Sequence, residues 1–225
     1  MKLKIFHQYI MTENLDQETF KKPSKIFVIG FNKTGTTSIN RLLQLENIKS
    51  IHTLTPVLKI INKYDAFTDG NHLNFKEYYK RFPDSVFILN TRSIYSWILS
   101  RYKHAKKHNF NRCWCWPISD KKTSGWINER ETHYKNILDF FKDKPHQLLI
   151  VNIERDGWEK VIIKFVKNKN TKVRLKLNTR DNHTVKNHMI DIINHTKEFL
   201  KKNNYTGDEL LCKEPINIEK YTSYL

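Results

Sequence analysis

The chain has 225 residues, a length that predicts one domain spanning 1–225. Its 13 Phe, 10 Tyr and 5 Trp can build a substantial core, which argues against a disordered chain. Basic residues number 40 against 23 acidic ones, so the formal net charge is +17. This excess favours an acidic partner, such as a charged nucleotide, an acidic glycan, a nucleic acid or an anionic membrane surface.

Cysteine content and hydropathy indicate the compartment. Cys113, Cys115 and Cys212 do not make a disulfide framework, which favours a reducing environment. Residues 1–24 are expected to form an irregular or short helical arm that Pro23 closes, without the apolar stretch of a signal peptide. No stretch approaches the length of a membrane span. We therefore expect a cytoplasmic protein.

Residues 25–41, KIFVIGFNKTGTTSINR, carry the clearest functional signal. An apolar strand at 25–29 leads into Gly30, a second glycine follows at Gly35, and a helix is expected over 36–46. Glycines allow a turn whose N–H groups point inward, and the helix N-terminus adds positive potential. Hydroxyl groups in the first helical turn can cap it or donate to an anion. The pattern predicts a phosphate cradle, with hydroxyls from Thr36, Thr37 and Ser38.

The spacing indicates which kind of cradle this is. Gly30 and Gly35 have the separation of a nucleotide P-loop, but Thr36 stands at the lysine position and Lys33 lies two residues before Gly35. This K-T-G-T-T-S pattern resembles the 5′-phosphosulfate loop of sulfotransferases that use 3′-phosphoadenosine 5′-phosphosulfate (PAPS). The resemblance implies that Lys33 neutralises charge on the bridging oxygen. It also implies a 5′-phosphate site formed by Thr34, Gly35, Thr36, Thr37 and Ser38.

A second motif follows the apolar strand at 86–89, which ends in Asn90-Thr91-Arg92. Sulfotransferases carry an arginine at the end of this strand and a serine eight residues later, and both hold the 3′-phosphate of PAPS. Arg92 and Ser100 have this spacing, and a strand-end arginine can make a bidentate phosphate contact. The usual Asp-Pro after the arginine is replaced by Ser93-Ile94. The family also places basic residues of a late loop near PAPS, which implicates Arg180.

The resemblance covers roughly residues 25–180. Its last part is a buried strand at 148–151 that ends at Asn152 and Glu154, followed by Asp156-Gly157-Trp158-Glu159. The alternation of apolar strands and amphipathic helices predicts an α/β fold, a parallel β-sheet flanked by helices on both faces. The resemblance implies that this is the P-loop NTPase-like fold of sulfotransferases, which transfer a sulfuryl group in line to a hydroxyl or amine without a metal.

A general base is expected at the end of a short buried strand that contains Tyr64, Ala66 and Phe67 and ends at Asp69. Binding sites of open α/β sheets lie at the carboxyl ends of strands, which is where Asp69 is expected. Asp69 is therefore the first candidate for the base, and His72 is the second. The alternative is structural, with Asp69 capping the helix expected over 72–81 and His72 exposed on it.

Residues 102–125 are expected to form a lid or an acceptor-binding segment. The stretch is basic and loop-like, and its aromatic residues beside lysines suit a small-molecule, glycan or other acidic acceptor. A zinc site is an alternative, because the segment also contains His104, His108, Cys113 and Cys115, although their spacing matches no common pattern.

Two other classes of protein remain open. One is a P-loop kinase or related enzyme that uses ATP with Mg²⁺, with Thr37 and Asp69 as metal partners. The position of Lys33 argues against it. The other is a non-catalytic protein that binds nucleic acid through its +17 charge, which would leave the Lys33 loop unexplained.

Overall fold

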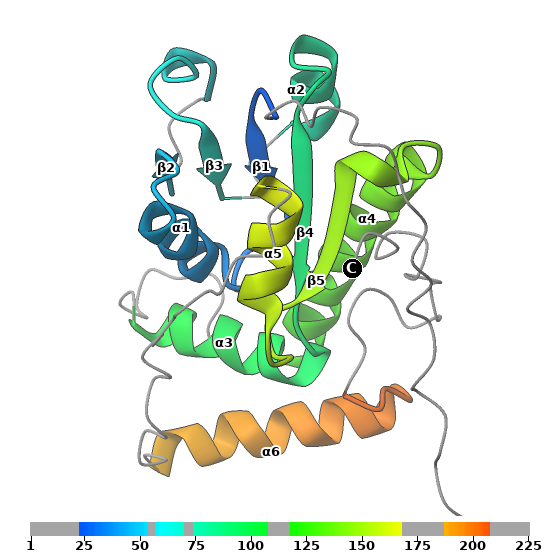
Figure 1. The fold of residues 1–225 in the computed structure, drawn as a ribbon. Coiled ribbons are helices and arrows are strands. Elements are labelled where there is room, and N and C mark those ends of the chain that lie inside the picture. The colour runs from blue at the N-terminus through cyan, green and yellow to red at the C-terminus, as the bar shows by residue number, and fades with distance from the viewer. Residues whose placement is uncertain (1–22, 54–56, 70–73, 108–117, 168–186, 208–225) are drawn as a thin grey trace, which may run out of the picture.

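The computed structural model describes residues 23–53, 57–69, 74–107, 118–167 and 187–207. Within these residues the strands form one five-stranded sheet in the order β2-β3-β1-β4-β5. All of its strand pairs are parallel, as the sequence predicts. Helices cover both faces, so the α/β fold class is confirmed (Figure 1).

The elements follow the predicted order closely. The strands are β1 (Ile26–Val28), β2 (Ser50–Ile51), β3 (Ala66–Thr68), β4 (Val86–Thr91) and β5 (Leu148–Asn152). The α-helices are α1 (Thr36–Leu45), α2 (Phe75–Arg81), α3 (Ile94–Lys107), α4 (Asp120–Phe141), α5 (Trp158–Lys167) and α6 (Asn187–Lys202). Two short 3₁₀ turns, η1 (Val57–Lys59) and η4 (Pro145–Gln147), complete the described elements.

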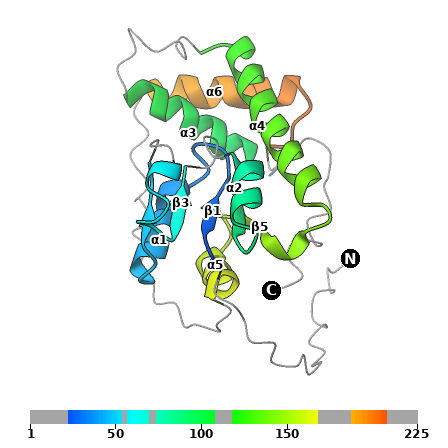
Figure 2. The same ribbon diagram turned by 90° about the horizontal axis from the view of Figure 1, so that it is seen from above.

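The core divides into two layers because alternate residues of each strand point to opposite faces of the sheet. Phe27, Phe67 and Phe87 lie at 0–1% exposure on one face, in a cluster that also contains side chains of α2, α3, α4 and α6. Val28, Ala66 and Ile88 lie on the other face with side chains of α1 and α5. Figure 2 shows α6 alongside α3, away from α5.

Two expectations about local structure are wrong. Helix α2 begins at Phe75, and its N-cap is Asn74, whose side chain accepts the Glu77 N–H at 3.3 Å. Asp69 therefore does not cap this helix. The segment 102–125 is also less loop-like than expected, because α3 continues to Lys107 and α4 begins at Asp120. His104 is thus helical, whereas His108, Cys113 and Cys115 lie outside the described residues.

Gly30 lies so close to Asn90 that no side chain would fit at this position. A Cβ on Gly30 would lie 2.2 Å from Asn90 Oδ1 and 2.3 Å from the Asn90 carbonyl oxygen. We expect Gly30→Ala to lower the free energy of unfolding by about 1–3 kcal/mol, because backbone or a buried amide must move. Urea denaturation would measure this loss.

Gly125 is the matched control, since it lies inside α4 and an added Cβ would meet nothing within 4 Å. Gly125→Ala should raise the free energy of unfolding by about 0.5–1 kcal/mol. Equal effects of the two substitutions would contradict the close contact between β1 and β4.

Candidate active site

The candidate site lies where the sheet changes winding direction. β1 pairs with β3 on one side and β4 on the other, so the chain leaves the carboxyl ends of β1 and β4 in different directions. Ligands of open α/β sheets bind at such a switch point. The loop 30–35 follows β1, and the turn at Arg92–Ser93 follows β4. The structure thus brings together the two predicted anion-binding motifs.

Asn90 fixes the loop 30–35 from the neighbouring strand. Its Oδ1 accepts the Gly30 N–H at 3.1 Å, and its Nδ2 donates to the carbonyl and hydroxyl oxygens of Thr34 at 2.7 and 2.9 Å. Asn90 and Thr34 are both fully buried. A buried amide is tolerated only when its hydrogen bonds are made, so this side chain holds the loop in one conformation.

Side chains of α3 hold the middle of the loop. Trp97 Nε1 donates to the Asn32 carbonyl oxygen at 2.9 Å, and Arg101 donates to Asn32 Oδ1. The Arg101 guanidinium lies 4.6 Å from the centre of the Trp126 ring. Burial lowers the pKa of Arg101 to about 10, but the group stays charged at neutral pH. Arg101 therefore adds a fixed positive charge beside the loop.

His133 of α4 fixes the start of the loop. Its Nε2 lies 2.7 Å from the Ile29 carbonyl oxygen, which can only accept, so this nitrogen carries the proton. Burial lowers the pKa of His133, although the bond to Ile29 acts against this effect. His133 also lines a surface hollow of about 510 Å³ together with Phe31.

The cradle itself has the backbone that an anion site requires. Lys33 and Gly35 have φ values of 65° and 94°, in the left-handed region. Helix α1 has no side-chain hydrogen bond at its N-cap Gly35, and the Ile39 N–H donates to the Gly35 carbonyl oxygen at 3.1 Å. The N–H groups of the first turn point out of such a helix end, toward any anion bound there.

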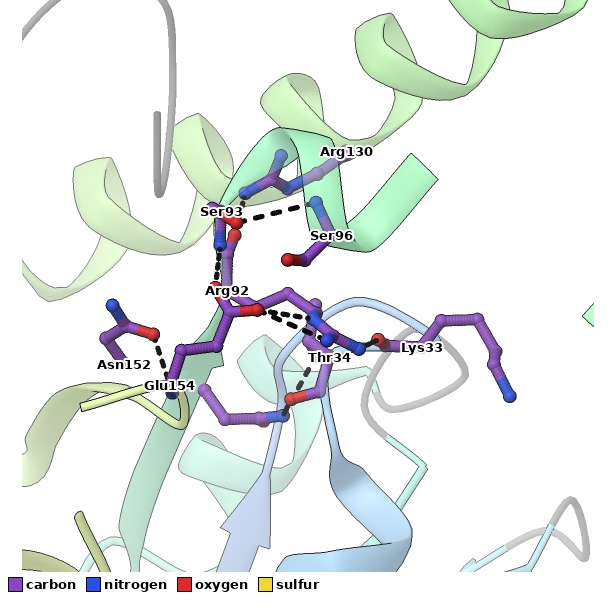
Figure 3. Close-up of polar contacts among 9 residues, drawn as sticks. Lys33, Thr34, Arg92, Ser93, Ser96, Arg130, Asn152 and Glu154 are labelled. Carbon is purple, nitrogen blue, oxygen red and sulfur yellow. Dashed lines mark hydrogen bonds and ion pairs between the residues drawn. The ribbon is translucent and has the colours of Figure 1, made fainter. Parts of the chain in front are cut away.

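Arg92 is held at three points. Its Nη1 donates to the Lys33 carbonyl oxygen at 3.4 Å, and its Nη2 forms a 3.2 Å ion pair with Glu154 Oε1. Its own carbonyl oxygen accepts from Nη2 of Arg130, a residue that is 1% exposed. The Arg130 guanidinium lies over the Trp97 ring at 4.9 Å. Figure 3 shows the Lys33 amine extending away from Arg92, and Lys33 Nζ lies 3.4 Å from His104 Nδ1.

Glu154 joins β5 to the start of α3. Its Oε2 accepts the Ser93 N–H at 2.8 Å, while Oε1 accepts from Arg92 Nε and Nη2 at 3.4 and 3.2 Å. Burial alone would raise the pKa of Glu154, but hydrogen bonds from Ser93 and Ser96 and the charge of Arg92 together lower it. The carboxylate is therefore ionised at neutral pH.

His52 lies beside the first turn of α1. Its Nδ1 contacts the carbonyl oxygen of Thr68 and lies 3.2 Å from the Thr68 hydroxyl, while its Nε2 lies 3.3 Å from Thr37 Oγ1. A carbonyl oxygen only accepts, so Nδ1 carries a proton and neutral His52 presents Nε2 as an acceptor to Thr37. Asp69, the expected base, follows Thr68 directly and is partly buried.

The predicted site residues differ in their surroundings. Thr34 is fully buried and its N–H donates to Phe31 at 3.3 Å, so it shapes the loop rather than facing an anion. Thr36 is 5% exposed, whereas Thr37 and Ser38 are exposed. Ser100 lies on α3, six residues after the helix begins at Ile94. His72 and Arg180 lie outside the described residues.

Sequence reasoning missed Asn90, His52 and the role of Glu154. A signal for Asn90 was present, because an amide at the end of the apolar run VFIL demands buried hydrogen-bond partners. His52 directly follows β2 and Glu154 lies two residues after β5, at the carboxyl edge of the sheet where Asp69 and Arg92 were identified. Their partners lie 15–62 residues away in the chain, so these contacts could not be predicted without knowing the register of the strands.

Residues 49–131 match the family model of the sulfotransferase domain. This match supports the assignment of the chain to the sulfotransferase family. The matched segment includes Asp69, Arg92 and Ser100, but not the loop at 30–35. A search among curated proteins finds no matching relative.

Among the described residues, no group of three or more His, Cys, Asp or Glu side chains could hold a metal ion. No described helix combines the length and apolar character needed to cross a membrane.

The Glu154 contacts predict a specific response to acid. A carboxyl whose pKa is lower in the folded state stabilises the fold above its ordinary pKa of 4.5, and this contribution is lost as pH falls through the folded value. We expect the free energy of unfolding of the wild-type protein to fall more steeply below pH 4.5 than that of Glu154→Gln. Urea denaturation across pH 3–7 measures both curves, and parallel curves would contradict the assignment.

Proposed function

We propose that this chain is a PAPS-dependent sulfotransferase that moves a sulfuryl group to a hydroxyl or amine acceptor. The main supporting observation is the contact between its two anion-binding motifs, Arg92 Nη1 to the Lys33 carbonyl oxygen at 3.4 Å. Each motif matches one phosphate of a 3′,5′-bisphosphorylated nucleoside. The contact fixes the two motifs relative to each other, as recognition of both phosphates on one ribose requires.

The residues present fit the donor. The N-terminus of α1 has no side-chain cap, and Thr37 and Ser38 in its first turn are exposed. Lys33 lies two residues before the N-cap, Gly35. Bound PAPS would supply the sulfuryl group and a phosphate leaving group. Lys33 would neutralise charge as it develops on the bridging oxygen, and backbone N–H groups from Gly35 onward would hold the 5′-phosphate. Arg92 and Ser100 would hold the 3′-phosphate.

The acceptor must lose a proton as the new bond to sulfur forms. Asp69 would take this proton, because it follows β3 at the carboxyl edge of the sheet, next to the strand that carries the loop. We propose a small-molecule or glycan acceptor, because the basic chain favours acidic groups on its substrates.

Calorimetric titration with adenosine 3′,5′-bisphosphate, the nucleotide product of PAPS, tests the donor site. We expect binding without Mg²⁺, and Arg92→Ala should weaken it by about 10- to 100-fold, the loss expected for a charged hydrogen bond. Lys33→Ala should lower PAPS-dependent turnover by about 100-fold or more. Lys80→Ala is the control, since this exposed lysine lies in the last turn of α2, before β4 begins. Binding of ATP only with Mg²⁺ would indicate a kinase instead.

Asp69→Asn tests the base separately. We expect turnover to fall by about 100-fold or more while affinity for adenosine 3′,5′-bisphosphate stays unchanged, because the carboxylate acts on the acceptor and not on the nucleotide. Unchanged turnover would move the base elsewhere. His52 would then be the next residue to test, since its Nε2 is presented at the same edge of the sheet.

A further inference from the structure

The carboxylate of Glu154 lies against Arg92, the arginine proposed to bind the 3′-phosphate, so its role rests on the proposed function. Neither of the two anion-binding motifs on which the proposed function rests includes Glu154. Its ion pair with Arg92 is nevertheless partly sheltered, with side-chain exposures of 24% for Arg92 and 29% for Glu154. A carboxylate in this place could compete with a phosphate for Arg92, or it could hold the guanidinium in place for the phosphate.

The contacts of Glu154 indicate the second role. It accepts the Ser93 N–H at the start of α3 at 2.8 Å, and the Ser96 hydroxyl also donates to it. The bonds to Arg92 are longer, at 3.2 and 3.4 Å. The carboxylate is thus anchored to the end of a helix, where the helix dipole favours a negative charge. Such a group stays in place whether or not Arg92 binds a ligand.

The geometry of Arg92 leaves donors for a phosphate. A guanidinium has five N–H groups. Glu154 takes the edge formed by Nε and Nη2, and the Lys33 carbonyl oxygen takes one N–H of Nη1. One further N–H of each terminal nitrogen remains to form a bidentate contact. Arg130 fixes the Arg92 backbone from the other side (Figure 3).

We propose that Glu154 is a positioning residue that holds the Arg92 guanidinium by one edge, so that its remaining N–H groups select nucleotides that carry a 3′-phosphate. The effect is one of pre-organisation, because a long side chain that is already fixed loses less entropy when it binds. Glu154 itself does not contact the nucleotide.

Glu154→Gln is the discriminating substitution. The amide has one oxygen, and if this oxygen accepts the Ser93 N–H, the amide NH₂ faces the donors of Arg92. The guanidinium would lose its partner and its fixed orientation. Simple removal of a competing negative charge would have the opposite effect and would strengthen phosphate binding. The sign of the change therefore separates the two roles.

The experiment measures the dissociation constants of the full-length protein for adenosine 3′,5′-bisphosphate and for adenosine 5′-monophosphate, which lacks only the 3′-phosphate. We expect Glu154→Gln to lower the preference for the bisphosphate by about tenfold. Affinity for the monophosphate should be unchanged, which a general loss of structure could not produce. The matched control is Glu46→Gln, since Glu46 forms a comparable 2.7 Å ion pair with Lys167, between α1 and α5.

A double variant tests whether Glu154 acts through Arg92. In an Arg92→Ala background, Glu154→Gln should not change the ratio of the two dissociation constants any further. An unchanged or increased preference in the single variant would overturn the positioning role while leaving the proposed function intact. If the wild-type protein binds neither nucleotide, the proposed function fails, and the role of Glu154 fails with it.

Discussion

The hydrogen bonds of Asn90 are the constraint on which the site depends. This side chain on β4 is fully buried. Its oxygen accepts the Gly30 N–H, and its amide nitrogen donates to the carbonyl and hydroxyl oxygens of Thr34. A buried amide with these bonds broken would cost several kcal/mol, on the order of the whole stability margin of many domains. The loop therefore keeps its shape without a ligand. Gly30 is required at the same point because its missing side chain is what lets Asn90 approach.

Two arginines, Arg101 and Arg130, place positive charge around this loop. Arg101 and Arg130 both lie against aromatic rings, and each donates to a polar atom at the site, the Asn32 side chain and the Arg92 carbonyl oxygen. Ring faces attract cations, so these contacts offset part of the cost of removing the two guanidinium groups from water. Arg92 differs from these two arginines because it forms an ion pair with a carboxylate, that of Glu154. The site thus combines fixed cations for shaping the loop with one cation that is oriented for a ligand.

Much of the fold could be predicted from sequence because its signals are local. The apolar runs that became β1, β4 and β5 are short and bounded by polar residues, and the buried positions Ile94, Trp97, Ile98 and Tyr102 repeat with helical spacing. Lys33 and Arg92 were found because each follows such a strand. The errors were also local: Asn74 is a better cap than Asp69 because it directly precedes the helix, and the basic segment after Tyr102 continues as helix up to Lys107.

The contact between the two anion-binding motifs could not be predicted from the sequence. The Arg92–Lys33 and Arg92–Glu154 contacts join residues 59 and 62 positions apart, and they follow only from the order of β1, β4 and β5 in the sheet. The family match begins at residue 49, beyond the loop, so it does not by itself assign Lys33 a role. The loop and the matched segment are nevertheless joined by hydrogen bonds. Within the matched segment, Asn90 donates to the Thr34 carbonyl oxygen, Arg92 to that of Lys33 and Trp97 to that of Asn32. The loop is therefore part of the same site as the matched segment, because its conformation is set by that segment.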